Sequence, residues 1–250
     1  MKTHPLLFIA ILTVCLFNSR PSMARNAATE TADDTELESL QQWKAYTEVR
    51  PESIQRFGLE RCFCITEIDS ALYRRIRNKS YKPACPVPCS DLRYLKVLHY
   101  THDGRIRLGE LVCHHSISKD LLAIFRTLYD ARYPIERMTL IDDYDADDIR
   151  SMEANNTSCF NFRKIQGSTR ISKHGTGLAI DINPRYNPYV RTRNDQTIVS
   201  PRGSAPYADR TRNFPYKIDT DDLCYRTFRK YGFTWGGSWR SLKDYQHFEK

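Results

Sequence analysis

The stretch "SKHGTGLAID", residues 172–181, places His174 and Asp181 at either end of a run of small residues. From Gly177 onward the alternating pattern predicts a strand on which Gly177, Ala179 and Asp181 share one face. Because glycine and alanine have almost no side chain, that face is open beside the carboxylate. His174 precedes Asp181 by seven residues, an odd separation that would put the imidazole on the opposite face of a continuous strand.

A turn within "GTG", residues 175–177, would bring His174 back beside Asp181, since glycine reaches backbone angles that other residues avoid. Such a pair alone is also typical of residues that only form hydrogen bonds, so a metal site needs a third ligand. The C-terminal "DYQHFEK" supplies one, because His247 stands there between Tyr245 and Phe248. We therefore expect His174, Asp181 and His247 to meet at one ion and to leave space above it for a substrate.

Two imidazoles and one carboxylate form the ligand set of a catalytic zinc site, which keeps one coordination position open. Hydrolysis at such a site also needs a general base, and the two candidates are Asp244 and Glu249. On a regular strand Glu249 shares the face of His247 and Asp244 does not. Assigning the base to Asp244 therefore requires a bend in the chain before His247.

The segment "STRISKHGTGLAIDIN", residues 168–183, followed by a terminal "DYQHFE", resembles the D-alanyl-D-alanine carboxypeptidase family of zinc peptidases. That family includes the VanY and VanX enzymes and phage L-alanyl-D-glutamate endolysins. Its pattern is S-x-H-x-x-G-x-A-x-D, then [DE]-x-x-H near the end. The fixed positions are all met, by Ser172, His174, Gly177, Ala179, Asp181, Asp244 and His247. The similarity is clearest over residues 106–250, and residues 25–90 do not carry it.

The resemblance implies a single zinc ion bound by His174, Asp181 and His247, with Asp244 as the general base. It also implies a fold like that of the Hedgehog and D,D-peptidase domains.

An arginine upstream of the histidine motif is a further family feature, and Arg163 stands at that place, with Arg170 as an alternative. By resemblance, Arg163 would hold a substrate carboxylate or the developing oxyanion through paired hydrogen bonds. The competing interpretation for either arginine is a surface ion pair. Ser172 would support the site or contact the substrate.

Residues 1–24 read as a secretory signal, with Lys2 at the start, the apolar run "PLLFIAILTVCLF" and a small-residue "SMA" before Arg25. The run is too short to span a bilayer by the rule of roughly 20 residues. A lipoprotein attached through Cys15 is disfavoured, because Val14 is large and the apolar run continues past it. The sequence thus predicts an exported monomer, periplasmic or extracellular, with no stable membrane insertion after the signal is removed.

The formal net charge of the chain is +8, and removal of the signal with Lys2 and Arg20 leaves +6. That balance favours an anionic partner. We expect this partner to be the stem peptides of peptidoglycan, which carry free carboxylates, and not nucleic acid.

The rest of the chain predicts an α+β fold with a small antiparallel sheet and flanking helices, the helices early and the strands in the later half. Residues 25–45 form a polar lead-in, and residues 46–250 form a single zinc peptidase domain. Within it we predict a helix over 66–77 capped by Thr66, and a hairpin of strands 92–101 and 105–114 with Asp103-Gly104 in the turn.

A second helix is predicted over residues 118–133 with Ser118 as its N-cap. A buried strand over 138–142 and a solvated acidic stretch over 142–148 follow. The insert over 183–211, rich in Pro, Arg and Tyr, reads as a loop that forms one wall of the cleft and helps to choose the substrate, with a simple surface excursion as the alternative.

Seven cysteines follow the signal, and an oxidising compartment makes structural disulfides the expectation for most of them: Cys62, Cys64, Cys85, Cys89, Cys113, Cys159 and Cys224. The odd count leaves one thiol over. A small zinc site made by "CFC" and "CPVPC" is the alternative, although that spacing is not typical of one.

Taken together, the motifs predict an exported zinc metallopeptidase that hydrolyses amide bonds in peptidoglycan stem peptides, of the D-alanyl-D-alanine carboxypeptidase type. The alternatives are an L-alanyl-D-glutamate endopeptidase on the same scaffold, a non-catalytic zinc-binding module, and a metal-dependent nuclease.

Overall fold

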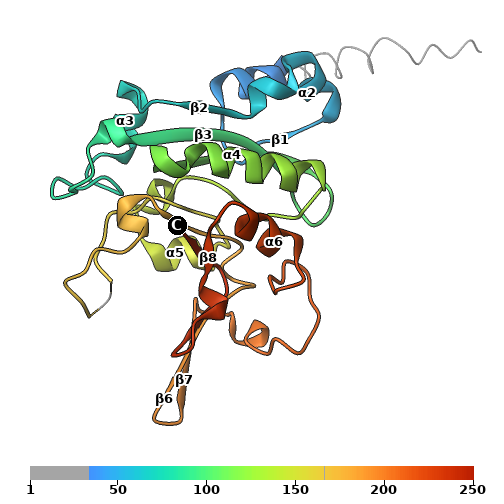
Figure 1. The fold of residues 1–250 in the computed structure, drawn as a ribbon. Coiled ribbons are helices and arrows are strands. Elements are labelled where there is room, and N and C mark those ends of the chain that lie inside the picture. Colours follow the sequence, from blue (N-terminus) through green and yellow to red (C-terminus); the bar gives the residue numbers. More distant parts are fainter. Residues whose placement is uncertain (1–33, 166) are drawn as a thin grey trace, which may run out of the picture.

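A computed structural model describes residues 34–165 and 167–250 (Figure 1). The predicted signal over 1–24 and most of the polar lead-in lie outside the described residues, while residues 34–42 of the lead-in are helical. Antiparallel strands pair in three sheets, and helices flank them, so the α+β prediction is confirmed, with three small sheets where one was expected.

The largest sheet has four strands in the order β1-β4-β3-β2 and lies in the first half of the chain, contrary to the expectation that strands gather in the later half. Its strands are β1 (Glu48–Val49), β2 (Cys64–Thr66), β3 (Leu92–Tyr100) and β4 (Ile106–His114). The predicted hairpin is confirmed: β3 and β4 pair from Leu92↔His114 to Tyr100↔Ile106. Gly104 makes the turn possible, because its φ of 79° is one that other residues avoid.

The helices are α2 (Pro51–Phe57), α3 (Ser70–Ile76), α4 (His115–Asp130), α5 (Asp148–Glu153) and α6 (Leu223–Lys230). Helix α4 lies along the four-stranded sheet and contacts α6 on its other side (Figure 1). Its apolar stripe, which includes Leu121, Phe125 and Leu128, is buried. Because one face of this helix is buried, its apolar residues recur with the helical period, and the helix predicted over 118–133 is present as α4.

Both predicted helix caps were wrong. Thr66 is the last residue of β2, where it pairs with Tyr94, so α3 begins later and is capped by the carboxylate of Asp69. Helix α4 begins at His115, and the Nδ1 atom of His114 accepts from the backbone of Ser116. Ser118 instead donates its hydroxyl to the carbonyl of His115. Thr66 does not cap a helix because it pairs with β3, and Ser118 does not cap α4 because His114 does so one turn earlier.

The predicted strand over 138–142 is also wrong. Only one backbone hydrogen bond, from Glu110 N–H to the carbonyl of Met138, joins it to β4, and the chain then turns into a 3₁₀ segment, Ile141–Tyr144. The acidic stretch that follows is not wholly solvated, because the carboxylate of Asp142 is buried and accepts from the backbone and hydroxyl of Ser80.

The insert over 183–211 contains a hairpin where a loop was expected. Strands β6 (Tyr189–Arg193) and β7 (Gln196–Ser200) are joined by Asn194 and Asp195, both at positive φ. Two such residues make the tight turn that suits the twist of a hairpin. The hairpin projects from the body of the molecule (Figure 1), and β6 pairs on its other side with β9 (Lys243–Asp244).

A third sheet joins β5 (Ala179–Asp181), β10 (His247–Glu249) and β8 (Thr234–Trp235) in the order β5-β10-β8. It shares one hydrophobic cluster with the four-stranded sheet, α4 and α6, and this cluster runs from Leu40 to Phe248. At its centre the rings of Phe228 and Phe248 stack with centroids 4.3 Å apart.

The outer edge of β4, which faces away from β3, ties the two halves of the chain together. Along this edge the backbone forms hydrogen bonds of 2.9 to 3.0 Å with four separate segments, at Thr47, Met138, Phe160 and Gly177. Strand β4 therefore fixes the position of residue 177, which belongs to the predicted metal motif.

The seven cysteines in the described part of the chain are free thiols, so the disulfides predicted among them are absent. Cys62, Cys113, Cys159 and Cys224 are buried and pack as small apolar groups in the core. Burial raises the pKa of Cys62 to about 12, which keeps it protonated. Among the described residues, neither "CFC" nor "CPVPC" takes part in a group of three potential metal ligands.

Across residues 34–165 and 167–250, no helix combines the length and the apolarity that crossing a bilayer requires.

Candidate metal centre

The turn that the sequence predicted before Asp181 is present. A 3₁₀ turn spans His174–Thr176, and Gly177 follows with a φ of 70°. The carbonyl of Gly177 accepts from the backbone of His114 at the end of β4, and a Cβ on Gly177 would lie 2.7 Å from that nitrogen. Both the backbone angle and the close approach therefore require glycine, and the turn carries His174 back over β5.

Asp181 and His247 come together because their strands pair. In the antiparallel pair of β5 and β10 the two residues stand directly opposite each other. Side chains of directly opposed residues lie on the same face of a sheet, so the carboxylate and the imidazole meet. The 66 residues that separate them in the chain do not matter to this contact.

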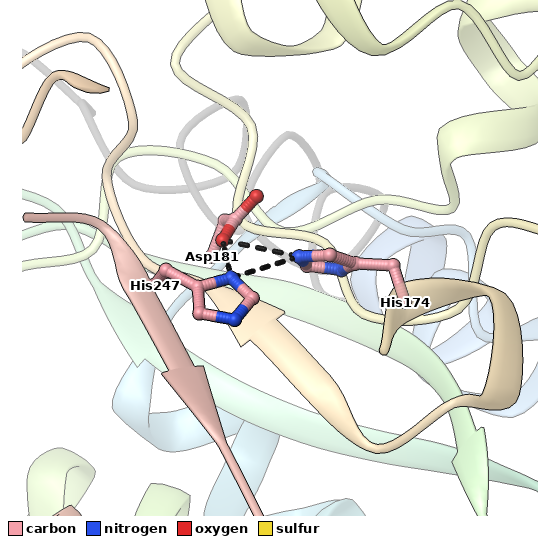
Figure 2. Close-up of side chains that lie close together, drawn as sticks. All are labelled: His174, Asp181 and His247. Atoms are coloured by element: carbon pink, nitrogen blue, oxygen red, sulfur yellow. Dashed lines mark hydrogen bonds and ion pairs between the residues drawn. The ribbon is translucent and has the colours of Figure 1, made fainter. Parts of the chain in front are cut away.

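The three side chains form a nearly equilateral triangle of potential ligand atoms (Figure 2). His174 Nε2 lies 3.2 Å from His247 Nδ1 and 3.2 Å from Asp181 Oδ1, and His247 Nδ1 lies 3.1 Å from Asp181 Oδ1. Two ligands of a tetrahedral zinc ion are about 3.3 Å apart, given bonds of about 2.0–2.1 Å. The triangle thus has the dimensions of one face of a zinc tetrahedron, with the fourth corner left open.

Hydrogen bonds behind each imidazole aim its lone pair at the centre of the triangle. His174 Nδ1 lies 2.7 Å from the carbonyl oxygen of Cys159, which can only accept, so Nδ1 carries the proton. His247 Nε2 lies 3.2 Å from Glu249 Oε2 in the same relation. Once a metal ion has displaced any proton between them, the unprotonated nitrogens therefore face each other and the Asp181 carboxylate. Such partners are typical of histidines that bind metals, and a cation satisfies all three atoms at once.

The electrostatics of the site also favour a cation. His174, Asp181 and His247 are all buried. Burial alone would raise the pKa of Asp181, but the charge and hydrogen bond of His174 and the hydrogen bond of His247 hold it well below its usual range. Burial likewise opposes protonation of His247, yet hydrogen bonds to Asp181 and Glu249 raise its pKa to about 10. His247 is therefore protonated near neutral pH when no ion is bound, so a metal ion that binds here takes the place of that proton.

Asp244 reaches the same site through the bend that its assignment required. Strand β9 ends at Asp244, residues 245 and 246 form a turn, and β10 begins at His247. Burial first, and the nearby Asp181 carboxylate second, raise the pKa of Asp244 to about 6. The side-chain amide of Gln246 donates to Asp244 Oδ1 at 3.1 Å. The other carboxylate oxygen, Oδ2, does not take part in this hydrogen bond.

Gly236 stands where Asp244 and His247 come closest to the rest of the chain. It begins a 3₁₀ turn, Gly236–Ser238, directly after β8. A Cβ on Gly236 would lie 2.6 Å from the Asp244 carbonyl oxygen, 2.9 Å from Asp244 Cβ and 3.2 Å from His247 Cβ. Only glycine leaves room for both residues. The double glycine in "TWGGSW", residues 234–239, is typical of such a tight turn.

Arg163 and Ser172 lie beside the His174 turn, but their contacts are structural. The guanidinium of Arg163 forms an ion pair with Asp148, the first residue of α5. The carbonyl of Arg163 accepts from the backbone of Ser172, and the hydroxyl of Ser172 accepts from the backbone of His174. Ser172 therefore supports the turn, and Arg163 makes the ion pair that was its competing interpretation. Arg170 is exposed, and its carbonyl accepts from Ile165.

Several residues of the site were not identified from the sequence. The carbonyl of Cys159 had no signal, because a backbone acceptor can belong to any residue type. Trp239, whose ring centroid is 5.3 Å from that of His247, has no place in the motif pattern. Glu249 was considered as a base, whereas its contact is with the far nitrogen of His247.

Comparison with protein families gives one match: residues 166–250 match the model of a family described as D-alanyl-D-alanine carboxypeptidase. This confirms the resemblance over residues 166–250, which contain the sequence motif, whereas residues 106–165, where the similarity was also expected, lie outside the match. The matched residues include all three potential ligands and Asp244. Arg163 lies just before the matched residues begin. Searches of curated proteins and of solved structures found no match.

Changing Gly236 to alanine tests this geometry. Because a Cβ there would overlap Asp244 and approach His247, we expect G236A to displace the strand that carries both and to weaken zinc binding roughly 10- to 100-fold. Competition with a chromophoric chelator measures the affinity. The control is G104A, at a positive φ of 79° with nothing within 4 Å, which strains the backbone alone and should leave zinc affinity unchanged. Equal losses in the two variants would contradict this account.

Proposed function

We propose that the chain is a zinc-dependent peptidase that hydrolyses amide bonds in peptidoglycan stem peptides. The family match supports a peptidase acting on peptidoglycan in general. The triangle of ligand atoms, with edges of 3.1 to 3.2 Å, is the single observation that carries the zinc assignment. Within this proposal His174, Asp181 and His247 hold one zinc ion, which when bound acts as a Lewis acid on the peptide carbonyl and the attacking water.

Asp244 is proposed as the general base. Its Oδ1 is held by Gln246, so Oδ2 is the oxygen that takes the proton of the attacking water and later passes it to the leaving amine. The pKa of about 6 suits both transfers near neutral pH, because the carboxylate is ionised there and yet is a stronger base than an exposed aspartate. Strand pairing with β6 holds this side chain in place.

Glu249 is the less suitable base, although it shares the strand face of His247. Its Oε2 is engaged with His247 Nε2, and that hydrogen bond lowers the pKa of Glu249. A carboxylate in this position orients the imidazole and increases its basicity as a ligand. We assign Glu249 this positioning role.

The proposed substrate bond is that of terminal D-alanyl-D-alanine, in keeping with the description of the matching family. Mass analysis of cleaved muropeptides distinguishes it from an internal L-alanyl-D-glutamate bond. We further propose that residues 1–24 direct export, so that the enzyme meets its substrate outside the cytoplasm as a monomer. Arg163 is proposed to hold a substrate carboxylate, which requires that its ion pair with Asp148 open or be shared.

Substitution of the two carboxylates by their amides separates their roles. We expect D244N to keep one zinc per chain and to lose hydrolysis of muropeptides by roughly 10²- to 10⁴-fold, because a neutral amide cannot take the proton of water. E249Q should weaken zinc binding roughly 10- to 100-fold and keep most of its activity at saturating zinc. If D244N kept full activity and zinc-loaded E249Q were inactive, Glu249 would be the general base and Asp244 would not. Hydrolysis by neither the parent nor E249Q would instead indicate a non-catalytic zinc-binding module.

The pH dependence follows from the ionisation of Asp244. The base must be deprotonated, so kcat/KM should fall tenfold per pH unit below its pKa. That pKa is about 6 without a metal ion, and a bound cation can only lower it, so the acid limb should lie at or below about pH 6. Initial rates between pH 4 and 8 at saturating zinc measure it. A limb above pH 7 would mean that another group is the base.

A further inference from the structure

The hairpin β6–β7 is joined directly to the strand that carries the proposed base. In the sheet β7-β6-β9, Tyr189 of β6 stands opposite Asp244 on one side and opposite Ser200 on the other. Directly opposed residues share a face, so the side chain of Asp244 lies on the same face as Tyr189. Every second residue of β6 beyond Tyr189, namely Arg191 and Arg193, continues this face away from the site.

The side chains confirm the assignment of the two faces. Thr192 and Thr197 stand opposite each other, and their hydroxyls are 2.9 Å apart on one face. Arg191 and Arg193 therefore project from the other face, where their cross-strand partners are Ile198 and Gln196. Ile198 is 59% exposed, the most of any large aliphatic residue in the described part of the chain. We call this face, made of Tyr189, Arg191, Arg193, Gln196 and Ile198, the arginine face.

Nothing in the described part of the chain neutralises the arginine face. Arg191 and Arg193 are exposed, and no carboxylate of residues 34–165 or 167–250 lies within ion-pair distance of either. The only acidic residue on the hairpin is Asp195 in the turn. Two unpaired guanidinium groups beside an exposed aliphatic chain form a surface suited to carboxylates that alternate with small apolar groups.

We propose that the arginine face is a binding surface for the acidic peptide chain of the substrate, continuous with the bond that is cleaved beside Asp244. This inference rests on the proposed function. At about 3.3 Å per residue, Arg191 and Arg193 lie roughly 7 and 13 Å beyond Tyr189 along the strand. An extended peptide has a similar rise, so carboxylates about two and four residues from the cleaved bond come beside the two guanidinium groups. Ile198 packs against methyl side chains between them.

A peptide is favoured over an anionic polymer such as a polyphosphate. The arginine face begins at the proposed base, so the ligand that covers it is continuous with the group that reacts there. The exposed aliphatic side chain of Ile198 also matches an alanine-containing peptide, whereas a phosphate chain has no apolar group to place against it.

The test compares two substrates and two pairs of substitutions. The substrates are a muropeptide with free carboxylates and the same muropeptide with the carboxylates away from the cleaved bond amidated. In R191Q/R193Q we expect kcat/KM for the free-carboxylate substrate to fall roughly tenfold through KM, with kcat, zinc content and the rate on the amidated substrate unchanged. The ratio of kcat/KM between the two substrates should also become insensitive to salt.

Two control variants make the result specific. T192A/T197A alters the opposite face of the same hairpin, and K44Q/R74Q removes two exposed positive charges from the N-terminal part of the chain. Both should keep the preference of the parent for free carboxylates.

An unchanged substrate ratio in R191Q/R193Q would overturn the proposal, whether the rates on both substrates stay the same or fall equally. If that variant also lost retention on a polyphosphate column, the arginines would be assigned to an anionic polymer. Cleavage of neither substrate by the zinc-loaded parent is a separate result, because it rejects the proposed peptidase itself.

Discussion

Three ligand atoms that carry lone pairs point at one buried spot, and this is the constraint on which the site depends. His174 Nδ1 is bonded to a carbonyl and His247 Nε2 to a carboxylate, so the opposite nitrogens face each other and Asp181 across 3.1 to 3.2 Å. Without a proton or a metal ion between them, these atoms would repel one another away from water. A divalent cation converts the repulsion into three bonds, and the carboxylates around it then have a partner.

The scaffold that delivers these atoms extends well beyond the matched region. Strand β4 holds Gly177 through His114, and it holds Phe160 next to the Cys159 carbonyl that orients His174. Thus residues of the first half of the chain set the turn and the tautomer of a ligand in the second half. Strand β9 is a shared element, because its pairing with the hairpin β6–β7 fixes Asp244 while the turn after it delivers His247. The proposed peptide contact on the hairpin and the position of Asp244 therefore depend on the same strand.

Local patterns in the sequence predicted the site better than they predicted the fold around it. The alternation in "GLAID" and the glycines before it placed His174 beside Asp181, because a strand period and a positive φ are properties of the local chain. The cap at Thr66, the strand over 138–142 and the loop over 183–211 were wrong, because pairing with β3, the edge of β4 and β9 decided those segments. The cysteines were misread as disulfides because burial of a thiol leaves no mark in sequence spacing. Glu249 and the Cys159 carbonyl depend on three-dimensional contact, so no spacing rule would have assigned their roles.

The most direct measurement of the central claim is anomalous X-ray diffraction at the zinc edge from crystals of the zinc-loaded protein. The account predicts one strong peak at bonding distance, about 2.0–2.2 Å, from His174 Nε2, Asp181 Oδ1 and His247 Nδ1, with one further position open to solvent. A zinc peak among the thiols of residues 62–89, or no peak near residues 174, 181 and 247, would contradict it.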